Sequence, residues 1–270
     1  MKSNHHQKKR KSFSYGGEPA ELKSLLSAFG LAERCCLDAL SPLVVFTRML
    51  VVGACFLISV PTFAEGGVSV QGTRIIYPQN AKEQTVRVSN SSTTASFLVQ
   101  SWVEDAHGKK SDDFVVTPPL FLSTPGRENT LRLLFTGASL PQYKESLYYF
   151  VTKQIPSEDK KELEGKNILK VALATRIKLF VRPDDLAVAR EDAPSLLSFT
   201  HVSSGLDIYN PTPYYLTLTH LNANGHALND IMVNPNEHSY EKAPADVNMV
   251  VLKSLDDYGA ETKQLQYTIK

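Results

Sequence analysis

Few residues in this sequence have the types and spacing that catalysis or metal binding requires. The chain contains no Gly-x-Ser-x-Gly turn, no His-Glu-x-x-His helix and no glycine-rich phosphate loop. Its three cysteines, Cys35, Cys36 and Cys55, leave the chain beyond residue 60 without a disulfide or a thiolate metal site. The seven histidines are scattered without the short intervals of a metal site: His5, His6, His107, His201, His220, His226 and His238. We predict a protein that is not an enzyme and uses no metal or cofactor.

A different chemistry, strand pairing, is open to the stretch from Asn167 to Pro183, N-I-L-K-V-A-L-A-T-R-I-K-L-F-V-R-P. It is long for a strand, rich in aliphatic and β-branched residues, and ended by a proline. The alternation places Leu169, Val171 and Leu173 on one face. Two interpretations stay open at this point. The stretch is an ordinary core strand with solvated charges, or an edge strand whose aliphatic residues pair with another chain.

Composition excludes several classes of partner. Charged residues make up 21% of the chain and hydrophobic residues 42%, as in an ordinary globular protein. The net charge of +1 gives no electrostatic reason to expect binding to nucleic acid or to a membrane surface.

The first 64 residues are typical of processing rather than of folded structure. An uninterrupted apolar run, residues 50–60, follows Arg48 and precedes Thr62-Phe63-Ala64, where small residues occupy the positions that a signal peptidase reads. The run is too short to span a bilayer. We predict a secretory signal peptide cleaved after Ala64. The upstream residues 1–48 are explained either by a start codon assigned too far upstream or by a real extra helix around residues 18–32.

The mature chain reads as short strands and turns in two all-β domains. We expect an N-terminal domain over residues 65–183, a linker rich in proline and charge over residues 184–194, and a C-terminal domain over residues 195–270. Seven short strands without a convincing helix between them predict an immunoglobulin-like sandwich for the first domain. They cover residues 68–77, 84–89, 96–104, 114–116, 130–135, 146–155 and 167–183. Trp102 is expected in the core, without a disulfide to pack on.

Several segments in order along residues 67–270 resemble the periplasmic pilus chaperones of the chaperone–usher pathway, closest to those of type 1 and P pili. They are G-V-S-V-Q-G-T-R-I-I-Y (67–77), V-T-P-P-L-F (116–121), E-N-T-L-R (128–132), K-E-S-L-Y-Y-F (144–150), T-R-I-K-L-F-V-R-P (175–183), N-P-T-P-Y-Y-L-T (210–217) and D-D-Y-G (256–259). Each is weak alone, but together, behind a signal peptide, they are specific. The short loop 156–166 without a cysteine pair resembles the short-loop subfamily.

The resemblance implies two immunoglobulin-like β-sandwiches in an L-shaped arrangement with an interdomain cleft, and a site made by named residues. Leu169, Val171 and Leu173 would complete the open core of a pilus subunit by donor-strand complementation. Arg74 and Lys178 would bind the subunit's C-terminal carboxylate. On a regular strand Lys178 faces away from the three donor residues. The sequence leaves open whether a twist or bulge intervenes or the lysine acts from the opposite face.

The resemblance also implies a structural network and a set of partners. Glu145, Arg182 and Asp257 match positions of an ion-pair network between the domains. The expected partners are pilus subunits, both pilins and adhesin, and the outer-membrane usher, in the periplasm, with the chaperone a monomer when bound to a subunit. The alternative is a secreted pilus subunit or adhesin. The mature sequence lacks the cysteines and the long alternating N-terminal extension that such subunits usually carry.

Overall fold

The computed structural model describes residues 66–157, 171–203, 205–244 and 246–269. The regular elements in these ranges are strands, apart from one 3-10 helix, Ala193–Leu196. The predicted signal peptide, its cleavage site, the upstream segment and Leu169 all lie outside the described residues. In the part of the chain that is described, no helix has the length and hydrophobicity needed to cross a bilayer.

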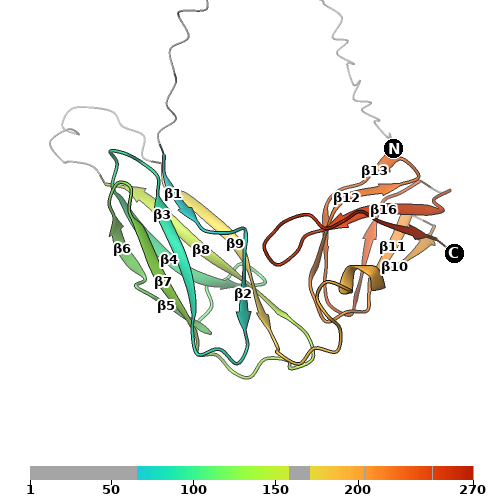
Figure 1. Cartoon of the computed structure of the whole chain (residues 1–270), viewed down its shortest axis with the longest axis horizontal. Helices are drawn as coiled ribbons and strands as arrows, with labels where there is room; N and C mark the ends of the chain where they lie inside the picture. The colour runs from blue at the N-terminus through green and yellow to red at the C-terminus, as the bar shows by residue number, and fades with distance from the viewer. Residues whose placement is uncertain (1–65, 158–170, 204, 245, 270) are drawn as a thin grey trace, which may run out of the picture. The chain divides into compact units, whose positions relative to one another are not determined.

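The first sandwich, coloured blue to yellow in Figure 1, contains two sheets packed face to face. Its strands are β1 (Val68–Val70), β2 (Arg74–Pro78), β3 (Gln84–Asn90), β4 (Phe97–Asp105), β5 (Phe114–Thr117), β6 (Leu120–Ser123), β7 (Glu128–Phe135), β8 (Ser146–Pro156) and β9 (Leu173–Arg182). One sheet has the order β1-β3-β7-β5 and the other β2-β9-β8-β4-β6. The inward-facing residues of both sheets form one core, with Tyr77, Leu131, Leu133, Phe150 and Leu179 fully buried.

The first strand of the sandwich is divided between the two sheets. We expected one strand over residues 68–77, and this was wrong, because the chain turns after β1 at Gly72, whose φ is 87°. As a result β1 pairs antiparallel with β3, while β2 pairs parallel with β9 in the other sheet. This switch places Arg74 directly beside Lys178 in the register. Strand β6, which follows Pro118-Pro119, was not predicted.

The predicted core position of Trp102 was also wrong. Along β4 the buried side chains are those of Val99, Ser101 and Val103, so the residues between them face the other side of the sheet. Trp102 is half-buried there, and its Nε1 donates a hydrogen bond to Glu104 Oε1 at 3.0 Å. Val99, Ser101 and Val103 therefore face the core from β4, where the tryptophan was expected.

The second sandwich is smaller and follows the 3-10 helix. Its strands are β10 (Ser198–Val202), β11 (Gly205–Asn210), β12 (Leu216–Ala223), β13 (His226–Ala227), β14 (Ile231–Val233), β15 (Glu237–Glu241), β16 (Met249–Ser254) and β17 (Leu265–Thr268). The sequence predicts strands here over residues 197–202, 206–210, 214–222, 230–234, 248–255 and 265–269, so β13 and β15 were not predicted. One sheet has the order β10-β11-β15 and the other β13-β12-β16-β17, with β14 paired to β12. Leu206, Ile208, Leu216, Leu218 and Leu252 are fully buried between them.

The segment predicted as a linker has side chains that belong to the second core. Leu186 and Val188 pack against that core, and Ala193 and Pro194 are buried in it. Pro194 lies at the start of the 3-10 helix, where its fixed φ and missing N–H cost nothing. The segment is therefore attached to the second sandwich through its apolar residues, and the predicted domain limits themselves stay a prediction.

Candidate functional site

The inward face of β9 changes from buried to exposed along the strand. Ile177, Leu179 and Val181 pack in the first core. On the same face, further toward the start of the strand, Leu173 is 59% exposed, and Val171, just before the strand, is 55% exposed. These two side chains line an open cavity of about 240 Å³ with Phe97 and Pro156, beyond the last covered part of the core. The chain thus presents apolar side chains that its own fold leaves uncovered.

The opposite face of β9 carries the basic residues. The register from Leu173 to Val181 against β8 is continuous, so no bulge separates the exposed leucine from Lys178. Lys178 therefore lies on the opposite face from Leu173, and the bulge that the sequence left open is absent between them. Arg74 is the register partner of Lys178 on the neighbouring parallel strand, so the two cations lie side by side.

Both cations are partly desolvated, and neither forms an ion pair with a described residue, although the charges of Asp257, Asp256 and Glu145 act on Arg74. Burial lowers the pKa of Lys178, and the nearby charge of Arg74 lowers it further. Burial also lowers the pKa of Arg74, and its Nε is a buried donor without a partner in the described part of the chain. The one hydrogen bond of Lys178 Nζ there is a long one to Thr217 Oγ1, at 3.4 Å. Two cations held in this way favour an anionic partner.

The remaining predicted site residues form a network around Arg182. Its Nε donates to Glu145 Oε1 at 2.7 Å, and its two terminal nitrogens donate to the Asp257 carboxylate at 2.6 and 2.7 Å. Burial acts to raise the pKa of Asp257, but the hydrogen bonds and charge of Arg182 outweigh it and hold that pKa below its usual range. For Glu145, which is almost fully buried, burial raises the pKa although Arg182 opposes the shift.

Local turns position the groups that meet this network. Asn210 is buried, and its side chain donates to the carbonyl of Tyr214 at 2.8 Å and accepts from the Thr212 hydroxyl at 2.7 Å. The turn so fixed presents the Tyr215 amide, which donates to Glu145 Oε2 at 2.8 Å. This contact gives the N-P-T-P-Y-Y motif a definite structural role.

A second arginine in the network was not predicted. Arg190 Nε lies 3.5 Å from Asp257 Oδ1, and Arg190 Nη2 donates a hydrogen bond to the carbonyl of Leu255 at 2.8 Å. Arg190 and Arg182 both lie over the ring of Tyr214, at 5.7 and 5.1 Å from its centroid. The only sequence signal was the proline and charge of residues 184–194, which indicated a linker instead. The described residues contain no cluster of three or more His, Cys, Asp or Glu that could hold a metal ion.

Comparison with known proteins extends over both sandwiches. Residues 67–187 match the family model of the pili and flagellar-assembly chaperone PapD N-terminal domain, and residues 192–266 match that of the PapD C-terminal domain. This chain belongs to the pilus-assembly chaperone family. The chaperone protein FimC of Escherichia coli K12 is 40% identical over 228 residues, which is 84% of this chain and 90% of FimC. The probable fimbrial chaperone SfmC of the same strain is 40% identical over 207 residues, 76% of this chain and 90% of SfmC.

Solved structures of pilus-assembly chaperones share the fold. The periplasmic chaperone SfaE is 38% identical, with a TM-score of 0.66 over 76% of this chain and all of SfaE. The SafB chaperone of Salmonella enterica, solved in complex with the SafA pilin, gives a match that is 27% identical, with a TM-score of 0.68 over 77% of this chain and 98% of the matched one. The predicted family and the two-sandwich fold class are thus confirmed. The roles of the individual site residues stay predictions.

Proposed function

We propose that this protein is a periplasmic chaperone that binds, folds and caps pilus subunits and delivers them to the outer-membrane usher. It acts by binding and not by catalysis. Family membership supports this reading, as does the similarity to a chaperone solved in complex with a pilin. In donor-strand complementation, the established mode of chaperone–pilin recognition, a chaperone strand completes the open sheet and core of the subunit. Leu169, Val171 and Leu173 are the donated residues.

The observation that carries the proposal is the combination of two unsatisfied groups of side chains, one exposed and apolar at the start of β9 and one cationic on β9 and its neighbour β2. Val171 and Leu173 are exposed apolar side chains, which would gain free energy from burial in another core. Arg74 and Lys178 are neighbouring cations, both with lowered pKa values, which would gain from an anion. A subunit with an open apolar groove and a C-terminal carboxylate satisfies both groups at once.

The carboxylate anchor also defines the register of the donated strand. Each charge-assisted hydrogen bond to a carboxylate contributes roughly 1.5–3 kcal/mol. A slip of one residue would turn Val171 and Leu173 away from the subunit core. The anchor therefore selects the pairing in which each apolar side chain meets its own pocket. Glu145, Arg182 and Asp257 support this geometry by holding the loop of residues 256–259 against β9.

Subunit capture tests the donated residues directly. Val171→Asp or Leu173→Asp places a charge in the core that the subunit must close, and burial of an unpaired charge is costly. Both residues are exposed in the free protein, so each variant should fold normally by circular dichroism and fail to co-purify a co-expressed subunit. Val115→Asp, at a residue 47% exposed on β5, is the matched control and should retain capture.

Two outcomes would contradict the proposal. Unfolded Val171→Asp and Leu173→Asp variants would assign the residues to the protein's own core, and unimpaired capture by both would remove them from the interface. The alternative, a pilus subunit or adhesin, makes a separate prediction. Mass spectrometry of purified pili would then detect this chain in the fibre, whereas a chaperone is absent from it.

A further inference from the structure

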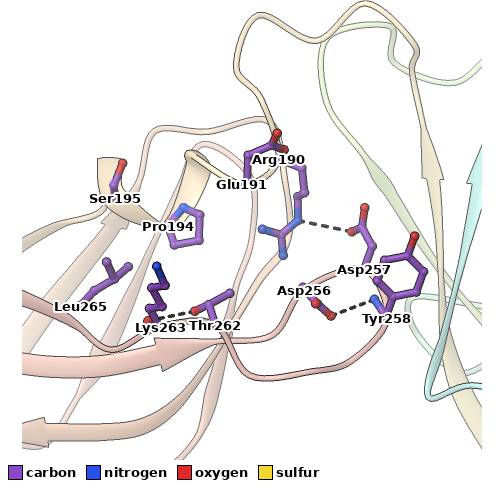
Figure 2. A pocket seen from close by; sticks show the side chains of 10 residues that line it. All are labelled: Arg190, Glu191, Pro194, Ser195, Asp256, Asp257, Tyr258, Thr262, Lys263 and Leu265. Carbon is purple, nitrogen blue, oxygen red and sulfur yellow. Dashed lines mark hydrogen bonds and ion pairs between the residues drawn. The ribbon is translucent and has the colours of Figure 1, made fainter.

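A cavity of about 400 Å³ lies beside the second sandwich, away from the exposed residues of β9. Two segments form it: residues 190–195, with the start of the 3-10 helix, and residues 256–265, which connect β16 to β17. Figure 2 shows side chains from both segments around the space between them, among them Arg190, Pro194 and Lys263. A cavity of this size is in the range that holds a small organic molecule.

The walls of the cavity are mostly apolar. Pro194 is buried in the second core and Leu265 packs on it, so both present fixed apolar surface. Tyr258, at the other end in Figure 2, has 88% of its surface exposed. An aromatic side chain with this degree of exposure would gain binding free energy from contact with an apolar ligand.

Two cations meet this apolar surface. Figure 2 shows the Arg190 guanidinium and the Lys263 ammonium directed into the space between the segments. Arg190 is held in place by Asp257 and by the carbonyl of Leu255, with its side chain only 12% exposed, and its third guanidinium nitrogen has no hydrogen bond within the described ranges. Lys263 Nζ forms no ion pair or hydrogen bond with any described residue. One nitrogen of Arg190 and the Lys263 ammonium are therefore hydrogen-bond donors without an acceptor among the described residues.

The nearby carboxylates use only part of this donor capacity, because Asp257 pairs with Arg190 through Nε and not through the third nitrogen of the guanidinium. Both oxygens of Asp257 accept hydrogen bonds from Arg182. Asp256 Oδ1 accepts from the backbone amides of Tyr258 and Ala260, at 2.9 and 2.8 Å, and so closes the turn before β17. In Figure 2 the carboxylate of Glu191 points away from Lys263. An anion between Arg190 and Lys263 would meet free donors.

We propose that this cavity binds a small amphiphilic carboxylate, with its apolar body against Pro194 and Leu265 and its carboxylate between Arg190 and Lys263. The site differs from the anchor for the subunit carboxylate in its cations, because it contains neither Arg74 nor Lys178, although Asp257 and Tyr258 also line the adjoining cavity that contains Arg74. Its occupancy does not depend on subunit capture.

Titration of the isotopically labelled mature protein, followed by amide chemical shifts, tests the proposal. Octanoate is the probe, 1-octanol supplies the chain without the charge, and acetate supplies the charge without the chain. Octanoate should give saturable shifts confined to residues 190–195 and 256–265, with a dissociation constant at least about ten-fold lower than those of the two controls.

Two matched lysine variants assign the charge contact. Lys263→Gln should weaken octanoate binding about ten-fold, as expected for the loss of one charge-assisted contact. Lys242→Gln, at another exposed lysine of the second sandwich without an ion pair in the described chain, should leave it unchanged. Absence of saturable shifts, equal binding of octanoate and 1-octanol, shifts centred elsewhere, or wild-type affinity in Lys263→Gln would each overturn the proposal.

Discussion

Replacement of Lys178 by methionine separates the binding role of this residue from any role in stability. Methionine keeps the length of the side chain and removes its charge. In the free protein the ammonium is partly buried beside Arg74, and its one hydrogen bond to a described residue, to Thr217, is 3.4 Å long. Loss of the charge therefore relieves repulsion as much as it removes attraction. We expect the free energy of unfolding to change by less than roughly 0.5 kcal/mol, or to rise.

The effect on binding should be larger and should depend on one group of the ligand. The loss of a charge-assisted hydrogen bond costs roughly 1.5–3 kcal/mol, which is about a 10- to 150-fold loss of affinity. The ligand is a peptide that copies the C-terminal strand of a pilus subunit, prepared as the free acid and as the amide. Wild type should prefer the free acid by about this factor, and Lys178→Met should lose most of that preference.

Calorimetry of the four protein–peptide pairs gives the coupling energy between the lysine and the carboxylate. Lys153→Met is the matched control, because Lys153 lies on β8 on the same face of the sheet and forms no ion pair within the described chain. That variant should keep the preference for the free acid. Equal binding of acid and amide to wild type would refute the carboxylate anchor. So would loss of the preference in the Lys153 control.

Three further predictions concern the same region. The proposed anchor needs the charged form of Lys178, whose pKa is lowered. Affinity for the free-acid peptide should therefore be highest below that pKa and fall as pH rises through it. In calorimetry, Lys178→Arg should abolish this fall. Asp257→Asn should lower the free energy of unfolding in urea by about 2 kcal/mol through lost contacts with Arg182. Because the pKa of Asp257 is lowered in the folded state, its contribution to stability should be present above the pKa of the unfolded state and vanish as pH falls through the pKa of the folded state. Equal acid sensitivity of wild type and variant would contradict this. Gly259→Ala should lower the free energy of unfolding by about 2 kcal/mol, because Gly259 has a φ of 84° and an added Cβ would clash with Thr73 Oγ1. An unchanged urea midpoint would refute this prediction.

The sequence was sufficient to predict most strands, because their alternation is strong and their ends carry turn residues. It failed where a local feature overrides alternation. We predicted β1 and β2 as one strand from their alternation. Both bury residues in the same core, but the buried positions change from an even number, Val68, to odd numbers, Ile75 and Tyr77, across the turn at Gly72. Trp102 was misplaced because residue type was given more weight than parity, and the buried neighbours on β4 define the face that points inward.

The candidate site was predictable residue by residue only through the family resemblance. No pattern in the sequence itself joins Arg74 to Lys178, because they meet through parallel pairing of segments about a hundred residues apart. Arg190 was missed for a similar reason. Its partners, Asp257 and the carbonyl of Leu255, come from a distant segment, and a backbone carbonyl leaves no mark in the sequence.

The regular register of β9 fixes the spacing between its exposed apolar end and Lys178. Lys178 follows Leu173 by five residues, which is about 17 Å along an extended strand. An odd spacing puts the charge on the opposite face from the donated side chains. The chaperone's own core then holds Ile177, Leu179 and Val181 on the inward face, while the anchor stays outside that core. The same strand can therefore be fixed in its own sandwich at one end and remain uncovered at the other. In the function we propose, the carboxylate contact would set where the donated residues begin.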